Sequence, residues 1–133
     1  MKVEAELYEI RNDETLNEHI VVLREKDGSK RLLPIVIGLF EAQSIELRVH
    51  GVQLPRPLTH DLLASVIQSL DGEVDHIYVS NLEGGTFFGR IYVRRGNDLI
   101  DIDSRPSDAI ALAVRVGVPI FVEDALLEQS GPT

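Results

Sequence analysis

Alternating apolar and polar residues mark the first strands of the chain. From Lys2 to Ile10 apolar side chains recur at every second position for most of the run, and a period of two predicts a half-buried β-strand. Residues 20–25 and 31–37 are rich in apolar residues and flank Asp27-Gly28. An Asp-Gly pair between two such runs is a strong signal for a hairpin turn. This part of the chain therefore predicts a strand followed by an antiparallel hairpin.

A helical spacing of apolar residues appears in three later segments. Residues 40–50 and 59–70 each carry an apolar stripe and are followed by a glycine that signals the end of a helix. Residues 107–116 are apolar on nearly every side, which predicts a helix buried between other elements. Thr59 is placed to cap the second helix. The stripe of that helix is expected to face a core, and its members are Leu62, Leu63, Val66, Ile67 and Leu70.

The remaining strands are expected in a hairpin series. Residues 74–81, 86–93 and 99–103 are separated by glycine-containing turns, which predicts a three-stranded antiparallel meander. Residues 119–122 predict a short strand, and residues 124–127 predict the start of a terminal helix. Because the strands follow one another in hairpins, the predicted fold class is α+β, with a mainly antiparallel or mixed sheet and three to four helices.

The composition is that of an ordinary globular protein. The 133 residues are 44% apolar and 26% charged, which suits a single compact domain with one core. We expect this domain to span residues 1–128, with a flexible tail at residues 129–133. The amino terminus lacks the apolar stretch of a signal peptide, and no apolar run approaches the roughly 20 residues of a membrane-spanning helix. We therefore expect a cytoplasmic protein with no membrane contact.

Two features of the composition restrict the chemistry. The chain contains no cysteine, which excludes disulfides, zinc–thiolate sites and cysteine nucleophiles. The 22 acidic residues outnumber the 13 basic ones and give a net charge of −9, whereas nucleic-acid binders commonly carry a basic surface. This acidic balance argues against tight nucleic-acid binding unless a bound cation reverses the local charge. No glycine-rich dinucleotide or phosphate-binding motif follows a predicted strand, so no organic cofactor is expected.

The densest group of polar residues lies between Asp101 and Asp108. Asp101 and Asp103 are two residues apart on a predicted strand and therefore point to the same face. The segment lies where this strand meets the predicted buried helix, and Asp108 falls in the first turn of that helix. Carboxylates gathered at this junction suit Mg²⁺ or Mn²⁺, and Arg105 can bind a phosphate with two hydrogen bonds. The alternative interpretation is helix capping, in which Ser104 or a neighbour accepts backbone hydrogen bonds and Asp108 favours the helix dipole.

A second group is Thr59-His60-Asp61. Capping accounts for Thr59 and Asp61, and His60 is left over. An imidazole beside a carboxylate can act as a general base or bind a metal, provided that it converges with the segment from Asp101 to Asp108. A solvent-facing histidine with no role is the alternative. The other three histidines, His19, His50 and His76, are isolated and lack metal-ligand spacing, and no role is assigned to them.

A basic and aromatic face is a further candidate. Three arginines and four aromatic residues on the predicted meander are suited to single-stranded nucleic acid, or else the aromatic residues fill the core and the arginines are solvated. These residues are Arg90, Arg94, Arg95, Tyr78, Phe87, Phe88 and Tyr92.

Five segments, taken in order, resemble the bifunctional nuclease domain family: Leu33–Gly38, Phe40–Ala42, Arg56–Leu63, Gly85–Arg90 and Asp103–Ala113. The resemblance covers nearly the whole chain and implies hydrolysis of both DNA and RNA. One departure is Phe88-Gly89, where the family pattern leads us to expect tyrosine and alanine. The positions that the resemblance carries over are His60, Asp61, Asp103, Arg105, Ser107 and Asp108.

Two hypotheses follow from these residues. The first is a nuclease with little sequence specificity, in which Asp103 and Asp108 hold Mg²⁺ or Mn²⁺, His60 with Asp61 activates water, and Arg105 stabilises charge on the phosphate. The second is a non-catalytic regulatory or protein-interaction domain in which the same residues cap helices. We also expect a homodimer, paired through an exposed strand edge at Thr86–Val93 or Lys2–Ile10.

Overall fold

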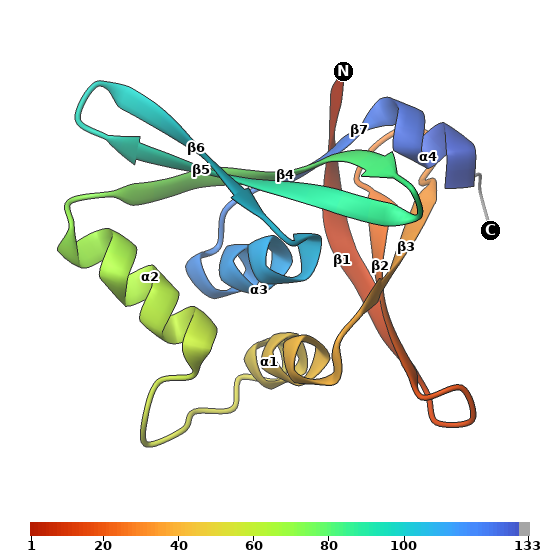
Figure 1. Cartoon of the computed structure of the whole chain (residues 1–133), viewed down its shortest axis with the longest axis horizontal. Coiled ribbons are helices and arrows are strands. Elements are labelled where there is room, and N and C mark those ends of the chain that lie inside the picture. Colours follow the sequence, from red (N-terminus) through yellow and green to blue (C-terminus); the bar gives the residue numbers. More distant parts are fainter. Residues whose placement is uncertain (131–133) are drawn as a thin grey trace.

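A computed structural model describes residues 1–130 of the chain. In it, one seven-stranded mixed sheet is combined with four helices (Figure 1). The predicted α+β class is confirmed. The strands are β1 (Lys2–Asp13), β2 (Glu18–Glu25), β3 (Leu32–Ile37), β4 (Glu73–Glu83), β5 (Thr86–Arg95), β6 (Asp98–Ser104) and β7 (Ile120–Glu123). The helices are α1 (Leu39–Val49), α2 (Thr59–Ser69), α3 (Pro106–Val116) and α4 (Asp124–Ser130).

The sheet joins two antiparallel halves through its shortest strand. β1, β2 and β3 form one half and the meander of β4, β5 and β6 forms the other. The hairpin of β2 and β3 and the meander were predicted, and the pairing of β1 with β2 is added by the structure. β7 lies between them, antiparallel to β1 and parallel to β4. The strand order is β3-β2-β1-β7-β4-β5-β6. The parallel pair arises because α3 carries the chain back across the sheet, which a hairpin cannot do.

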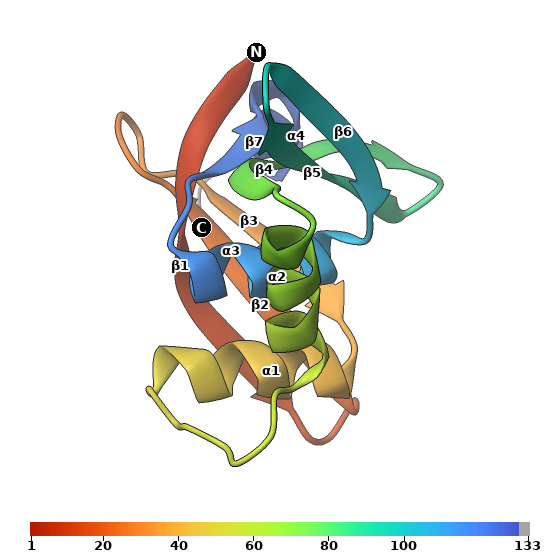
Figure 2. The same ribbon diagram turned by 90° about the vertical axis from the view of Figure 1, so that its left-hand side faces the viewer.

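α3 is the centre of the core, as the apolar sequence predicts. Residues 109–113 of this helix are at most 1% exposed. α3 contacts β4 and β5 on one side and α1 and α2 on the other. Figure 2 shows α1 and α2 as the outer layer over α3. This stacking brings the amino-terminal ends of α2 and α3 towards α1, which positions the site described below.

The predicted burial of α2 is wrong for three of its residues. Leu62, Val66 and Leu70 are 55%, 45% and 61% exposed. α2 packs on α3 and β4 from one side only, so Leu63 and Ile67 on that side are half-buried and the other apolar residues face outward. An apolar stripe wider than the contact between helices leaves part of the stripe in water.

The two strands expected at the sheet edges lie inside the sheet. β5 is flanked by β4 and β6, and β1 is flanked by β2 and β7. The free edges are β3 and β6. The interior position of β1 depends on the return of β7, a pairing between opposite ends of the chain that no local pattern reveals.

The carboxyl-terminal helix is longer than predicted. α4 continues through Ser130, so residues 129 and 130 of the predicted tail are helical, and residues 131–133 lie outside the described part of the chain. In residues 1–130 no helix has the length and apolar content needed to cross a bilayer.

Gly89 marks a close approach between β5 and the start of α3. A Cβ atom at this position would lie 3.0 Å from the Cα and N atoms of Pro106 and 3.1 Å from the Ser104 hydroxyl. The absence of a side chain therefore lets the sheet support the first turn of α3 directly.

Candidate functional site

The predicted residues His60, Arg105 and Asp108 line one cleft between α1, α2 and α3. Its volume is about 450 Å³, and Glu41 and Ser44 of α1 complete its polar lining. A larger cavity of about 730 Å³ lies between the carboxyl-terminal ends of α2 and α3 and the meander, and none of the predicted catalytic or metal-binding residues lines it. The three predicted residues that come together therefore lie at the smaller cleft.

Helical periodicity explains why these side chains meet. Asp108 and Arg115 are two turns apart on α3, and Glu41 and Ser44 are one turn apart on α1, so each pair projects from one helix face. His60 stands in the first turn of α2 and enters between these two faces. The loop before α2 contains Pro55 and Pro57, which cannot extend a helix and so keep α2 from starting earlier.

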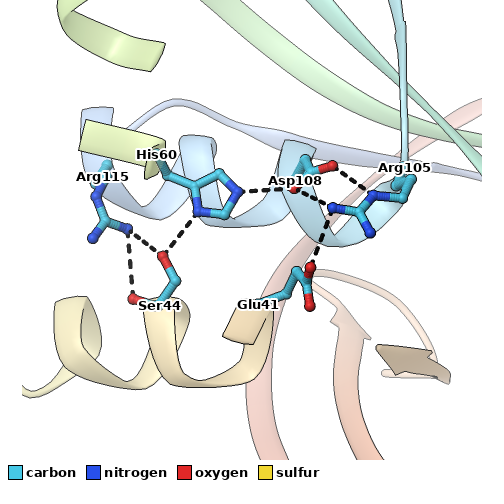
Figure 3. Close-up of polar contacts among 6 residues, drawn as sticks. All are labelled: Glu41, Ser44, His60, Arg105, Asp108 and Arg115. Atoms are coloured by element: carbon cyan, nitrogen blue, oxygen red, sulfur yellow. Dashed lines mark hydrogen bonds and ion pairs between the residues drawn. The ribbon is translucent and has the colours of Figure 1, made fainter. Parts of the chain in front are cut away.

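A continuous chain of hydrogen bonds runs through the cleft (Figure 3). Arg115 Nη1 lies 3.2 Å from Ser44 Oγ, which lies 2.9 Å from His60 Nδ1. His60 Nε2 lies 2.9 Å from Asp108 Oδ1. We call the residues Arg115, Ser44, His60 and Asp108 the relay. Both ring nitrogens of His60 are thus engaged, and the His60 residue is only 7% exposed.

Arg105 extends the relay to the mouth of the cleft. It donates from Nε to Asp108 Oδ2 at 2.8 Å and from Nη2 to Asp108 Oδ1 at 3.1 Å. The same Nη2 reaches Glu41 Oε1 at 3.2 Å. The Arg105 side chain is 67% exposed, so it is the member of this group that an incoming anion meets first.

Asp108 is held as a carboxylate. Burial works to raise its pKa, but hydrogen bonds from Arg105 and His60 outweigh burial and lower the pKa below its usual value. In return, the hydrogen bond to Asp108 raises the pKa of Arg105. A carboxylate that only accepts hydrogen bonds leaves the proton between Asp108 and His60 on Nε2 of the ring.

Asp61 does not pair with His60, although the two are adjacent in sequence. Its carboxylate accepts hydrogen bonds from Arg115 Nε and from the backbone N–H of Leu58, the latter at 2.9 Å. The Arg115 bond chiefly lowers the pKa of Asp61, against the opposing effect of burial. Since the Arg115 side chain is only 6% exposed, Asp61 compensates a buried charge. The acid partner of His60 is Asp108.

The predicted caps also differ from those in the structure. The N-cap residues are Leu58 for α2 and Arg105 for α3, and neither makes a side-chain capping bond. Thr59 lies inside its helix, and the buried Ser104 hydroxyl has no partner within the described residues. Asp61 bonds the backbone of Leu58, and Asp108 lies in the first turn of α3, as the capping interpretation predicts. Capping leaves His60 and the Arg105 side chain unexplained.

Asp103 lies on the sheet, away from the relay. Arg90 of β5 donates from Nη1 to Asp103 at 3.2 Å and from Nε to Asp101 at 2.7 Å, which places both carboxylates on one face as predicted. Asp103 is not among the residues that line the cleft. It makes no hydrogen bond to Asp108 or His60 in the described part of the chain.

The carboxylates therefore do not form a ready cation site. Asp103 and Asp108 are each neutralised by a different arginine, and within the described residues no three histidine or acidic side chains are arranged to hold a metal ion. Mg²⁺ and Mn²⁺ require several convergent oxygen ligands. This arrangement does not fit the predicted cation, which stays a prediction for an activity assay to test.

The serine in the hydrogen-bonded chain is Ser44 and not Ser107, the serine that the motifs indicated. Ser107 is buried in the first turn of α3 and lines a separate pocket with residues of β3. Ser44, which no motif indicated, is in the relay. The available signals were a polar residue between the buried Ala42 and Ile45, and Arg115 in a helix predicted to be buried.

Only part of the predicted basic and aromatic face forms: Tyr78 lies opposite Arg90 and His76 opposite Tyr92 across β4 and β5, whereas Phe87 packs against the core. Tyr92 stacks on His76 with ring centres 4.4 Å apart, and Lys2 Nζ lies 4.3 Å above the Tyr92 ring. Arg90 and Arg94, however, are paired with acidic residues. Since their charges are compensated, this face is a weak candidate for nucleic acid.

Comparisons with known proteins converge on one family. The model of the bifunctional nuclease domain matches residues 21–133. An uncharacterized protein of Mycobacterium tuberculosis (strain H37Rv) is 42% identical over 128 residues, which cover 96% of this chain and 76% of that protein.

Plant relatives carry the family name. Bifunctional nuclease 1 of Oryza sativa subsp. japonica is 30% identical over 118 residues, covering 85% of this chain and 35% of that protein. Bifunctional nuclease 2 of Arabidopsis thaliana is 30% identical over 114 residues, covering 84% and 35%. This chain therefore corresponds to about a third of the length of these plant proteins.

Proposed function

The chain belongs to the bifunctional nuclease domain family, and from this premise we propose that it hydrolyses phosphodiester bonds of DNA and RNA at the cleft between α1, α2 and α3. The observation that carries the proposal is the hydrogen-bonded chain from Arg115 through Ser44 and His60 to Asp108, which ends beside the exposed Arg105. The plant relatives are named as nucleases, and the residue roles below come from the chemistry of the cleft.

Arg105 is the proposed phosphate-binding residue. Its guanidinium is planar, exposed and already at the cleft mouth, and this geometry matches two phosphate oxygens. A phosphate that replaces Glu41 as its partner keeps the arginine neutralised. Because Arg105 pairs with both Asp108 and Glu41 in the unliganded cleft, a phosphate must displace Glu41 to bind.

His60 and Asp108 are the proposed proton-transfer pair. Phosphodiester hydrolysis needs a base for the attacking oxygen and an acid for the leaving oxygen. An imidazole supplies both functions in turn, and the carboxylate 2.9 Å away stabilises the imidazolium between the two steps. Neither residue recognises a base or a sugar hydroxyl in this role, which is consistent with action on both DNA and RNA and with little sequence preference.

Cleavage of labelled single-stranded RNA and DNA by purified protein tests the proposal. His60→Gln is expected to abolish cleavage, and His50→Gln is the matched control because His50 is exposed at the end of α1. Thermal unfolding of each variant separates lost chemistry from lost folding. Equal cleavage by both variants would point to a contaminating nuclease.

The same assay tests the predicted cation. Parallel reactions contain EDTA, Mg²⁺ or Mn²⁺. Cleavage that requires a cation and is lost in Asp103→Asn would support the sequence prediction, whereas cleavage in EDTA would assign the reaction to the relay alone. No cleavage under any of these conditions would favour the alternative, a non-catalytic regulatory or protein-interaction domain.

A further inference from the structure

Ser44 has a hydroxyl whose hydrogen is directed by its neighbours. The Arg115 guanidinium only donates hydrogen bonds, so Ser44 Oγ accepts the bond from Arg115 Nη1 at 3.2 Å. The second neighbour of the hydroxyl is His60 Nδ1, 2.9 Å away. When Nε2 carries the ring proton and donates to Asp108, 2.9 Å away, Nδ1 has a lone pair. In this tautomer the Ser44 hydroxyl donates its hydrogen to a base.

These contacts meet the geometric requirements of an activated serine. A serine hydroxyl becomes a nucleophile when a histidine lies within hydrogen-bond reach and a third group orients that histidine. Ser44, His60 and Asp108 satisfy both distances, on three different helices. Arg115 adds a donor that stabilises negative charge as it develops on the serine oxygen.

We propose that Ser44 is the nucleophile of the cleft and forms a covalent intermediate in which Ser44 Oγ is esterified to the phosphate that ends the cleaved strand. This inference rests on the proposed nuclease function and deepens it, because it specifies which oxygen attacks the phosphorus. Ser44 is only 6% exposed but lines the cleft. A phosphate bound by Arg105 at the cleft mouth must move inward to meet it.

The reaction balances without a further reactant. Ser44 Oγ attacks phosphorus and its proton passes to His60 Nδ1, while the bond from phosphorus to the leaving sugar oxygen breaks and that oxygen takes the proton. Water then attacks the phosphorus of this intermediate, His60 Nδ1 accepts a proton from the water, and the bond from phosphorus to Oγ breaks as the proton returns to Ser44. The sum is the addition of one water to one phosphodiester bond.

The stereochemistry at phosphorus distinguishes this route from direct attack by water. The probe is a single-stranded DNA oligonucleotide with one phosphorothioate linkage of known configuration, cleaved by the wild-type protein in ¹⁸O-labelled water. Each in-line displacement inverts the phosphorus, so two displacements through Ser44 give overall retention. Retention is the expected result. Inversion would overturn the role of Ser44 while leaving the nuclease function intact, and no cleavage of the matching unmodified oligonucleotide would reject the nuclease function itself.

Substitution gives an independent test. Ser44→Ala is expected to lower the cleavage rate by a factor on the order of 10³, and Ser65→Ala, an exposed serine on α2, should cleave as the wild type does. A Ser44→Ala protein that is folded and cleaves within about threefold of the wild type would contradict the proposal. If Ser44→Ala does not fold, the stereochemical result on the wild-type protein decides the question.

Discussion

Replacing Asp108 by asparagine tests the proton-transfer pair quantitatively. The change keeps the shape of the side chain and removes its charge. In the wild type the carboxylate lies 2.9 Å from His60 Nε2 and stabilises the imidazolium that forms when the ring accepts a proton. Two unit charges about 4 Å apart at an effective dielectric constant of about 20 attract by about 4 kcal/mol.

That energy is an upper bound for the effect of the substitution on the barrier. Arg105 shares the same carboxylate, and the Asp108 side chain is 26% exposed, so solvent screening reduces the attraction to about 2 kcal/mol at the low end. Because each 1.36 kcal/mol is about a tenfold change in rate, we expect Asp108→Asn to cleave between about 30-fold and about 1,000-fold more slowly.

The assay is single-turnover cleavage of labelled single-stranded DNA, with denaturant unfolding as the measure of folding. Asp103→Asn is the matched control, since it makes the same chemical change five residues earlier, where the partner is Arg90 rather than His60. A folded Asp108→Asn protein that cleaves within threefold of the wild-type rate would refute the electrostatic reasoning. Equal losses in both variants would favour a role that the two carboxylates share, such as cation binding.

Four further outcomes follow from the same contacts. Arg105→Lys should raise KM about tenfold with a smaller effect on kcat, because lysine binds a phosphate as a point charge without the bidentate geometry. Steady-state kinetics would measure both constants, and an unchanged KM would exclude Arg105 as the phosphate-binding residue. Asp61→Asn should lower the free energy of unfolding by about 1–2 kcal/mol at pH 6. The pKa of Asp61 is lowered in the folded state, so its contribution to the free energy of unfolding is present above the unfolded pKa and is lost as pH falls through the folded pKa. Denaturant unfolding should therefore show a smaller difference in stability between Asp61→Asn and wild type at pH 2 than at pH 6. Gly117→Ala should cost about 1 kcal/mol, since Gly117 ends α3 at φ 74° and a Cβ there meets no atom within 4 Å, which leaves backbone strain as the cause; an unchanged unfolding midpoint would contradict this. We expect sedimentation to show a dimer that Val66→Glu converts to a monomer. The reason is that the exposed apolar stripe of Leu62, Val66 and Leu70 carries no charge, although the chain has a net charge of −9. A dimer that persists in the variant would place the interface elsewhere.

The local sequence was sufficient for the elements of the fold. Alternation along β1, the Asp-Gly turn between β2 and β3, and the glycine turns of the meander each act over a few residues, so neighbouring residues alone determine them. The apolar run of α3 likewise predicted its burial. The sequence also singled out His60, Arg105 and Asp108, because polar side chains beside a buried helix stand out from their surroundings, and the structure places all three in one cleft.

Which distant residues contact one another was decided only by the tertiary structure. His60 is adjacent to Asp61 in sequence but pairs with Asp108, 48 residues away, and Ser44 enters the relay from a third helix. The edges of the sheet depend on β7 inserting beside β1 from the other end of the chain. The period of a helix or strand specifies which way a side chain faces within its own element. Which element it meets depends on how the layers stack, and only the packing of α1 and α2 over α3 fixes that geometry.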